Sequence, residues 1–517
     1  MPHTGQQGFQ VNICLIRPPV LVPKFNMALT LTPPLGLAYV AGALRHAGFA
    51  VNFIDGVGEG LEDVHPSEND CLIYGLSLAS IVEKIPQDTD LIGVSAQYSF
   101  EWPLYQDLIK LVRSRFPKTL IAAGGEHITA MPSDCLASSE LDCCVLGEGE
   151  ATVVDMASAL ERRNRDLTAV PGLAFKTADG RIVLNERRPR IRDLDGIAWP
   201  AWDILPIEEY LDRNLSFGVD RGRSLPVLAS RGCPYQCAFC SNKKMWGSLW
   251  RVRNHQKFLD ELQFYQEKYK IRNFDFYDLT AVINKSWIMD FCEGKKRRGL
   301  EFTWQLPSGT RSEALDRDSV TAMYESGCRN LSFSPESGSG AVLKLIQKKI
   351  SLENMLASMR ECVRAGLNIK ANIIFGFPGE TQRHILESFV FIIRMAAAGV
   401  HDLSIWAFSP YPGSRLFDQL QAQGKITLDD DFFDRLRSYA DASKTVSYNE
   451  NLSNRDLKIL RVIGTLLFYC VSYLVRPWRV AKLIANVVKG KQESRFEMAI
   501  VKTINRYQNR KKAKTGC

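Results

Sequence analysis

Histidine is scarce in this chain, and the features of a secreted protein are missing. Only 7 of the 517 residues are histidine. The first ten residues are polar and contain no apolar signal-peptide core, so we expect a cytoplasmic protein. Because cytoplasmic thiols stay reduced, the 13 cysteines do not predict a disulfide framework. Most of them stand singly among apolar residues, as small buried side chains do.

Long apolar runs are also rare. Residues 462–475 (VIGTLLFYCVSYLV) form a run of fourteen residues, whereas a membrane-spanning helix needs about 20. Pro477 follows, and residues 478–488 mix Trp, basic and aliphatic side chains. Two alternatives stay open for residues 456–517. They form a core helix with a solvated basic end, or they make peripheral contact with the inner face of a membrane.

Negative charge is sparse at the C-terminal end. Residues 476–517 contain 12 Lys and Arg but only Glu493 and Glu497, a balance of +10 compared with +8 for the whole chain. Such a segment can bind anionic lipid or nucleic acid, or can simply be solvated. Aromatic residues are not interleaved with the basic ones here, so we expect no nucleic-acid partner.

Residues 1–170 alternate between strand and helix patterns. Short apolar runs that end in turn residues predict buried strands, and helical periodicity appears between them. This alternation predicts an α/β fold with an open, Rossmann-like parallel sheet covered by helices on both faces. The predicted strands are 11–16, 51–54, 91–95, 119–123 and 143–146, and the predicted helices include 35–47 and 102–115. Residues 171–224 are irregular and are interpreted as a linker.

A second α/β series occupies residues 225–424. Six strands suit a partial (β/α)6 TIM-like barrel, in which functional residues follow the C-terminal ends of the strands. Residues 425–517 are predicted to be mainly helical. The predicted barrel strands are 225–230, 273–277, 302–305, 330–334, 369–375 and 402–408, and the predicted helices include 352–365 and 384–398.

One group of cysteines is closely spaced. Cys233, Cys237 and Cys240 form a C-x3-C-x2-C loop directly after the first barrel strand. Three thiolates can bind three irons of a 4Fe-4S cluster, which leaves the fourth iron free to chelate amino and carboxylate groups. Zinc is the alternative, but it usually takes four ligands in paired spacing, and no fourth Cys or His lies nearby in the sequence. The spacing therefore favours a 4Fe-4S cluster.

The cysteine loop, with an aromatic residue before its last cysteine, resembles the signature of the radical S-adenosylmethionine (SAM) superfamily. Further segments resemble its landmarks in order: 304–311, GCRNLSFSPESGS at 327–339, IIFGFPGET at 373–381 and SPYPGS at 409–414. An arginine and a glutamate at strand ends can bind a zwitterion. Asp278-Leu279 departs from the paired acidic motif of the superfamily. The resemblance implies SAM binding by Phe239, Arg311, Glu336, Gly376, Pro378 and Pro410.

The first domain resembles the cobalamin-binding domain that precedes some radical SAM barrels. The resemblance lies in GGEHITA at 124–130, GEGE at 147–150 and SAQY at 95–98, three loops after predicted strands. Ligands of open sheets bind at such loops, although ordinary βα turns are the alternative. The resemblance implies cobalamin binding by Ser95, Gln97, Tyr98, Gly124, Gly125, His127, Gly147, Glu148 and Gly149.

A histidine ligand for cobalt is not expected. Some cobalamin proteins supply one from a D-x-H-x-x-G motif, and residues 63–68 (DVHPSE) carry Glu where that motif needs glycine. His127 lies in a different pattern. We therefore predict that cobalamin is bound without a protein histidine on cobalt and that His127 packs near the corrin.

Together these resemblances imply a cobalamin-dependent radical SAM enzyme. Its expected activity is methylation of an unactivated carbon, with a 5′-deoxyadenosyl radical and methylcobalamin. Oxidative cyclisation or ring rearrangement of a hydrophobic or tetrapyrrole substrate is the alternative, as in the anaerobic Mg-protoporphyrin monomethyl ester cyclase. A non-catalytic cobalamin or cluster sensor is the second alternative. The expected partners are a small-molecule or lipid-like substrate and an electron donor such as flavodoxin or ferredoxin.

Overall fold

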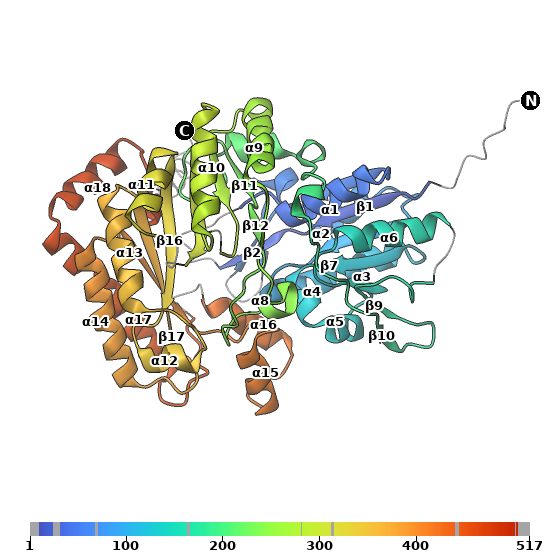
Figure 1. The fold of residues 1–517 in the computed structure, drawn as a ribbon. Coiled ribbons are helices and arrows are strands. Elements are labelled where there is room, and N and C mark those ends of the chain that lie inside the picture. The colour runs from blue at the N-terminus through green and yellow to red at the C-terminus, as the bar shows by residue number, and fades with distance from the viewer. Residues whose placement is uncertain are drawn as a thin grey trace, which may run out of the picture.

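The chain folds into two α/β units that lie side by side, with further helices packed on the outer side of the second (Figure 1). The computed structural model describes residues 10–23, 31–67, 71–162, 166–280, 282–311, 315–439, 444–501 and 503–504. Glu68, the last residue of the DVHPSE segment, lies outside these residues. The basic C-terminal end lies outside them from residue 505 onward.

The first unit is a seven-stranded sheet in the order β10-β9-β8-β7-β6-β1-β3. Strands β8, β7, β6, β1 and β3 run parallel, whereas β9 and β10 are antiparallel additions at one edge. The strands are β1 (Ile13–Arg17), β3 (Val51–Asp55), β6 (Leu91–Ser95), β7 (Leu120–Gly124), β8 (Cys143–Val145), β9 (Leu173–Lys176) and β10 (Ile182–Leu184). The predicted open parallel sheet is confirmed.

Helices cover both faces of this sheet. Leu44 of α1 (Leu35–His46) and Met156 of α6 (Glu150–Glu161) belong to the core on one face. Leu108 of α3 (Trp102–Arg115) and Ile81 of α2 (Leu78–Lys84) belong to the core on the other face. Strands β9 and β10 extend this sheet into the segment interpreted as a linker, because β9 pairs with β8 and leads into a hairpin.

The second unit is a six-stranded parallel sheet in the order β11-β14-β15-β16-β17-β18. Its strands are β11 (Ser224–Val227), β14 (Asn273–Phe276), β15 (Thr303–Thr310), β16 (Cys328–Glu336), β17 (Asn368–Phe375) and β18 (Asp402–Ala407). Its outer helices are α9 (His255–Tyr269), α10 (Lys285–Arg297), α11 (Arg317–Glu325), α12 (Gly340–Leu345), α13 (Leu352–Arg364) and α14 (Gln382–Ala398). The predicted partial barrel is confirmed.

Side chains alternate across the barrel strands, as the two-residue period of a strand requires. In β17, Ile369, Ala371 and Ile373 are buried in the core shared with the helices. Lys370 and Asn372, which alternate with them, therefore face the inner side of the barrel.

Two smaller sheets complete the strands. Strand β2 (Val20–Pro23) pairs with β5 (Cys71–Tyr74), which also pairs with β4 (Val64–Ser67). Strand β12 (Ser230–Arg231) pairs with β13 (Arg251–Val252), so the strand predicted at 225–230 is divided between β11 and β12.

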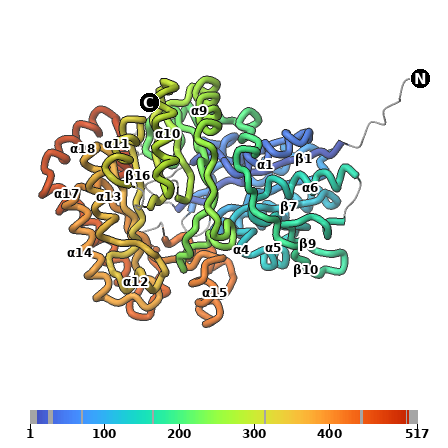
Figure 2. Tube along the Cα trace, in the orientation of Figure 1, coloured from blue at the N-terminus to red at the C-terminus, as the bar shows by residue number. Residues whose placement is uncertain are grey.

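The C-terminal region is helical, as predicted, with α15 (Arg415–Ala422), α16 (Asp430–Leu436), α17 (Asn454–Val475) and α18 (Trp478–Val488). Helix α17 has 22 residues and is longer than its apolar run, because Ser453 caps it at the start of the helix. By length and apolarity it could cross a membrane, and only 22% of its most apolar window is buried in the protein. Figure 2 shows α14, α17 and α18 together at the outer end of the barrel.

Candidate functional site

The three closely spaced cysteines lie on the loop between β12 and α8 (Asn242–Trp246). Cys233, Cys237 and Cys240 are all half-buried free thiols. The loop is held from both sides at one residue, Ala238. The Ala238 N–H donates to Ile346 O at 2.8 Å, and Ala238 O accepts from Leu416 N–H at 2.9 Å. These two backbone contacts fix the loop against the segments that follow α12 and begin α15.

Asp278 fixes the chain immediately before the loop. Its Oδ1 accepts from the Ser230 N–H and hydroxyl, both at 2.5 Å, and its Oδ2 accepts from Ala229 N–H at 3.1 Å. Burial raises the pKa of Asp278 to about 6, although these hydrogen bonds favour the ionised form. The single carboxylate in Asp278-Leu279 therefore has a clear structural role.

The residues expected to contact SAM lie at the C-terminal ends of adjacent barrel strands. Arg311 follows β15, Glu336 ends β16, Gly376 and Pro378 follow β17, and Pro410 follows β18. The guanidinium carbon of Arg311 lies 3.3 Å from the centre of the Tyr235 ring, which belongs to the cysteine loop. Strand order thus brings residues from four distant segments to the edge that carries the cysteines.

A buried ion pair lies beside Cys237. Lys348 Nζ is 2.9 Å from Glu336 Oε1, and both side chains are 9% exposed. Burial raises the pKa of the Glu336 carboxyl, and the Lys348 charge opposes this shift. Lys348, Glu336 and Arg311 all act electrostatically on Cys237. An ammonium and a carboxylate are thus available next to the loop that would hold an iron with an open position.

Phe239 packs behind the loop. Its ring centre is 5.5 Å from that of Phe377, which is fully buried within the GFPGE segment. Gly376 has φ +91°, a conformation that favours glycine, and its N–H donates to Glu380 Oε2 at 2.6 Å. This turn places an apolar wall against the loop.

The three loops expected to bind cobalamin meet at one edge of the first sheet. They follow β6, β7 and β8, which are neighbours in the sheet. Ser95, Gly124 and Gly147 stand at the ends of these strands, with Gln97, Tyr98 and Gly149 in the loops. Gly125 has φ +127°, and a Cβ there would lie 2.4 Å from Ala96 O. Glycine at this position therefore lets two loops approach closely.

Glu148 of the GEGE loop does not point freely into this edge. Its Oε2 accepts from Arg190 Nε at 2.7 Å, and its Oε1 lies 3.2 Å from the Arg231 guanidinium. Arg231 also pairs with Glu150 Oε1 at 2.7 Å and is only 6% exposed. Since Arg231 ends β12, two residues before Cys233, this network ties the first sheet to the cysteine loop.

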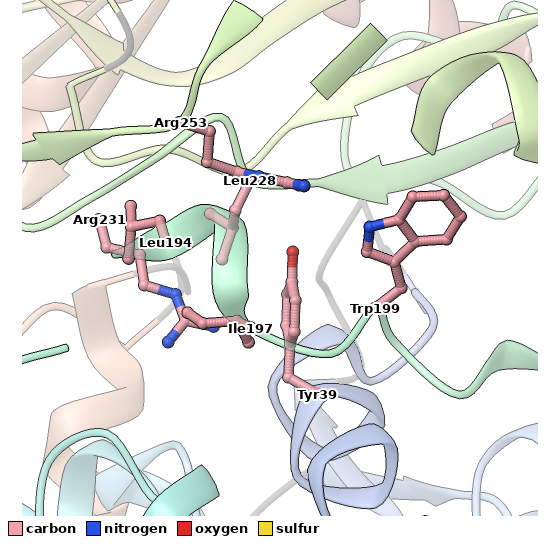
Figure 3. A pocket seen from close by; sticks show the side chains of 7 residues that line it. All are labelled: Tyr39, Leu194, Ile197, Trp199, Leu228, Arg231 and Arg253. Atoms are coloured by element: carbon pink, nitrogen blue, oxygen red, sulfur yellow. The ribbon is translucent and has the colours of Figure 1, made fainter. Parts of the chain in front are cut away.

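A small cavity lies on the other side of Arg231. Figure 3 shows Tyr39 of α1 beside Arg231 and Arg253 of the barrel, with residues of the connecting segment between them. The cavity has a volume of about 10 Å³, which leaves room for no more than one water molecule. The two units are therefore closely packed against each other at this point. Its lining residues are Tyr39, Leu194, Ile197, Trp199, Leu228, Arg231 and Arg253.

His127 is enclosed by apolar side chains. It is 1% exposed, its Nδ1 lies 3.0 Å from Ser99 Oγ, and its Nε2 has no hydrogen-bond partner in the described part of the chain. Its ring is 4.8 Å from that of Trp102 and 5.8 Å from that of Phe433. Burial lowers the pKa of His127 to about 3, so the ring is neutral.

Comparison with known proteins matches both units. Residues 27–157 match the B12 binding domain and residues 227–392 match the radical SAM superfamily. An uncharacterized methyltransferase of Pyrococcus horikoshii is 30% identical over 412 residues, which cover 79% of this chain and 83% of the relative. The chain belongs to the cobalamin-dependent radical SAM family. The predicted family and enzyme class are confirmed.

Members of the family differ in their reactions. The anaerobic magnesium-protoporphyrin IX monomethyl ester cyclase of Rubrivivax gelatinosus is 27% identical over 394 residues, covering 75% of this chain and 66% of the cyclase. The fold is shared with the cobalamin-dependent SAM radical enzyme OxsB, solved with aqua-cobalamin and SAM, with a TM-score of 0.66 and 16% identity over 97% of this chain and 75% of OxsB.

The cofactors of this family member are a 4Fe-4S cluster, SAM and cobalamin, and its residues fit them. The cysteine loop is pinned at its backbone, which leaves the three thiols free to bind separate irons. The Glu336–Lys348 pair matches the amino and carboxylate charges of a methionine moiety. The loops after β6, β7 and β8 lie at one edge of the sheet, and glycines in the second and third of them keep this edge open to a large flat ligand.

Sequence patterns missed several residues of the site. Lys348 lies outside the recognised motifs, and only its place twelve residues after Glu336 could have drawn attention to it. Glu126 lies within GGEH, and its Oε1 accepts from the Ser241 hydroxyl, next to Cys240. Arg231 directly precedes the loop, but nothing in the sequence indicates that its partners lie in the other unit.

Proposed function

We propose that this protein methylates an unactivated carbon of a hydrophobic small molecule. When bound, SAM and cobalamin supply the radical that removes hydrogen and the methyl group that replaces it. The Glu148–Arg231–Glu150 network supports this function most directly, because it fixes the cobalamin loops relative to the cysteine loop. We therefore infer that the two cofactor sites lie next to each other.

We assign the protein groups the following tasks. Cys233, Cys237 and Cys240 hold the cluster. Glu336 and Lys348 orient the methionine moiety. Phe239 packs against the GFPGE turn, where Gly376 and Pro378 form a wall for the adenosine. Arg311 and Pro410 contribute to the SAM site from neighbouring strand ends. Three neighbouring loops hold the corrin. They contain Ser95, Gln97 and Tyr98, then Gly124, Gly125 and His127, and finally Gly147, Glu148 and Gly149. Residues 1–170 together with β9 and β10, residues 225–424 and residues 425–517 are assigned as cobalamin-binding, radical SAM and C-terminal units, and the rest of 171–224 joins the first two.

Product analysis tests the function. The reconstituted holoenzyme, given SAM, a reductant and candidate hydrophobic substrates, is expected to form 5′-deoxyadenosine and S-adenosylhomocysteine. The product should gain 14 mass units, as replacement of hydrogen by methyl requires. Cys237→Ala should abolish both SAM products, whereas Cys470→Ala, at an exposed cysteine of α17, should not. Absence of both SAM products from the loaded wild-type protein would overturn the proposal.

Cyclisation remains the second candidate, supported by the similarity to the Rubrivivax cyclase. The two reactions share their cofactors but differ in product mass. A cyclised or oxidised product changes in hydrogen or oxygen content without the gain of a methyl group.

We infer peripheral contact with the inner face of the cytoplasmic membrane through the C-terminal helices. Leu474, Trp478 and Val488 are 81%, 63% and 80% exposed, and Leu386 and Val390 of the adjacent α14 are 62% and 58% exposed. Exposed apolar surface of this extent marks an interaction site. The flanking region carries 12 Lys and Arg from residue 476 onward, which favours anionic lipid. We also expect an electron donor such as flavodoxin or ferredoxin as a partner.

A further inference from the structure

Two cations lie on the inner side of the barrel without an ion-pair partner among the described residues. Lys370 projects inward from β17, because its neighbours Ile369 and Ala371 face the helices. Arg495 follows α18 and reaches the barrel from the N-terminal ends of the strands, where its backbone N–H donates to Asp402 Oδ2 at 2.7 Å. Burial and the Arg495 charge lower the pKa of Lys370 to about 7, so Lys370 lies close enough to Arg495 to share its environment, and an anion bound beside it would favour its charged form.

Two carboxylates lie near these cations, and they differ: Asp275 is engaged with uncharged donors, whereas Oδ1 of Asp402 has no hydrogen-bond partner among the described residues. Asp275 accepts from Gly218 N–H at 2.8 Å, Gln305 Nε2 at 2.7 Å and Asn273 Nδ2 at 2.9 Å. Asp402 pairs with Lys370 in strand register but forms no ion pair with it. Burial raises the pKa of both carboxyl groups, and the Arg495 and Lys370 charges oppose these shifts. Among the described residues neither cation forms an ion pair with Asp275 or Asp402, so both remain available to a bound anion.

Aromatic rings connect Lys370 to the cobalamin loops. Lys370 Nζ lies 5.7 Å from the Trp406 ring centre. The Trp406 ring is 5.8 Å from Tyr439, which is 6.4 Å from Phe100, and Phe100 stacks on Tyr98 at 5.6 Å. Tyr98 follows β6, so this row of rings runs from the cobalamin edge to the inner side of the barrel. A row of rings that ends at an ammonium fits a molecule with an apolar body and an anionic end.

We propose that Lys370 and Arg495 bind an anionic group of the substrate, a carboxylate or a phosphate, while its apolar body lies along Trp406, Tyr439 and Phe100. The assignment rests on the proposed function, because the anion belongs to the molecule that is methylated. Lys370 lies near the start of β17, five residues before its end at Phe375. At about 3.3 Å per residue, the Lys370 backbone lies roughly 17 Å of strand from the cofactor edge, but its ammonium reaches back to Trp406, the next-to-last residue of β18. The substrate is therefore an amphiphile with an apolar body and an anionic end.

Matched probes test this assignment in the holoenzyme. We would measure binding of 4-(1-naphthyl)butanoate, of 4-(1-naphthyl)butan-1-ol and of the phosphate ester of that alcohol by equilibrium dialysis. At least one anionic probe should bind about tenfold or more tightly than the alcohol, as one charge-assisted hydrogen bond permits. The stronger of the two anions identifies carboxylate or phosphate as the preferred group. Equal binding of all three probes would overturn the assignment.

Variants separate charge recognition from structural effects. Lys370→Met should remove the preference for the anion and leave binding of the alcohol nearly unchanged, and Lys370→Arg should retain the preference. Arg495→Gln provides a second test if Lys370→Met fails to fold. Lys257→Met, at an exposed lysine of α9, is the matched control. If Lys370→Met weakened all probes equally, Lys370 would be structural and the assignment wrong. SAM cleavage, measured on the same samples, reports separately on the proposed function.

Discussion

The Asp278 carboxylate accepts two hydrogen bonds from Ser230, one from its backbone N–H and one from its hydroxyl. Ser230 lies three residues before Cys233, so this contact sets the start of the cysteine loop, to which we assign the cluster. The carboxylate is buried, and no other acidic side chain accepts from Ser230 among the described residues. The relationship gives a direct way to disturb the cluster without changing a ligand.

Replacing Asp278 with Asn should lower the iron content of the reconstituted protein. The amide keeps the size of the side chain but loses acceptor capacity and charge, and charge-assisted hydrogen bonds contribute about 1.5–3 kcal/mol each. Iron and acid-labile sulfide per chain measure the effect. Asp318→Asn, in the first turn of α11, is the control. Full iron content in Asp278→Asn would show that the loop is fixed by its other contacts.

Replacing Lys348 with Met should weaken SAM binding by about tenfold, because one charged hydrogen bond to the methionine moiety is lost. Glu336 would also be left as a buried carboxylate without its partner. Isothermal titration of the cluster-loaded protein with SAM gives the dissociation constant. Lys344→Met, on α12, lies four residues earlier and should bind SAM normally. Unchanged affinity in Lys348→Met would remove this residue from the SAM site.

Replacing Arg231 with Gln should loosen the contact between the two units. Removing one member of a buried ion pair costs about 3–5 kcal/mol, because the remaining charge stays buried. The variant should retain less cobalamin after gel filtration and unfold at a lower denaturant concentration. Arg223→Gln removes pairs with Glu208 and Asp212, two exposed carboxylates, and should change both properties little. Equal effects of the two variants would contradict the role given to Arg231.

His127 should make the protein sensitive to mild acid. An unfolded imidazole binds a proton below about pH 6.5, whereas burial lowers the pKa of folded His127 to about 3. The unfolded chain therefore binds more protons within this window, and stability is complete above it and falls as the pH is lowered. Between pH 7 and pH 5, His127→Gln should lose less unfolding free energy than the wild type. His46→Gln, at an exposed histidine of α1, should behave like the wild type.

Cobalamin should be bound without imidazole nitrogen on cobalt, because His127 is enclosed by Trp102, Phe433 and Ser99. Electron paramagnetic resonance of the Co(II) form should lack nitrogen hyperfine splitting from histidine. The spectrum of His127→Phe should match that of the wild type. Splitting that disappears in this variant would identify His127 as the ligand.

The C-terminal helices should bind vesicles that contain anionic lipid. Binding to mixed phosphatidylcholine and phosphatidylglycerol vesicles, followed by flotation, should weaken with added salt. The double variant Leu474→Glu and Val488→Glu should float less, since each inserted side chain contributes about 1.5–3 kcal/mol. Leu249→Glu changes an exposed leucine of the barrel and is the control. Absence of wild-type binding at low salt would contradict membrane contact.

The sequence predicted the regular elements of both sheets well, because parallel strands are buried on both faces and appear as continuous apolar runs. Strands 91–95 and 402–408 are recovered as β6 and β18 with at most one residue of difference. Strands β2 and β4 were not predicted, because they are short and partly exposed and their pairing with β5 depends on contacts distant in the sequence. For the same reason the motifs indicated Glu336 but not its partner Lys348.

Arg495 makes two contacts with the barrel. Its backbone N–H donates to Asp402 at the N-terminal end of β18, and its guanidinium carbon lies 4.8 Å from the centre of the Phe217 ring. Arg495 follows α17 and α18 in the sequence. A chain truncated before these helices, to obtain a more tractable protein, would therefore also lose Arg495 from the N-terminal end of the barrel. Surface point substitutions on the two helices, with the full-length chain retained, are therefore the sound route for expression and crystallisation.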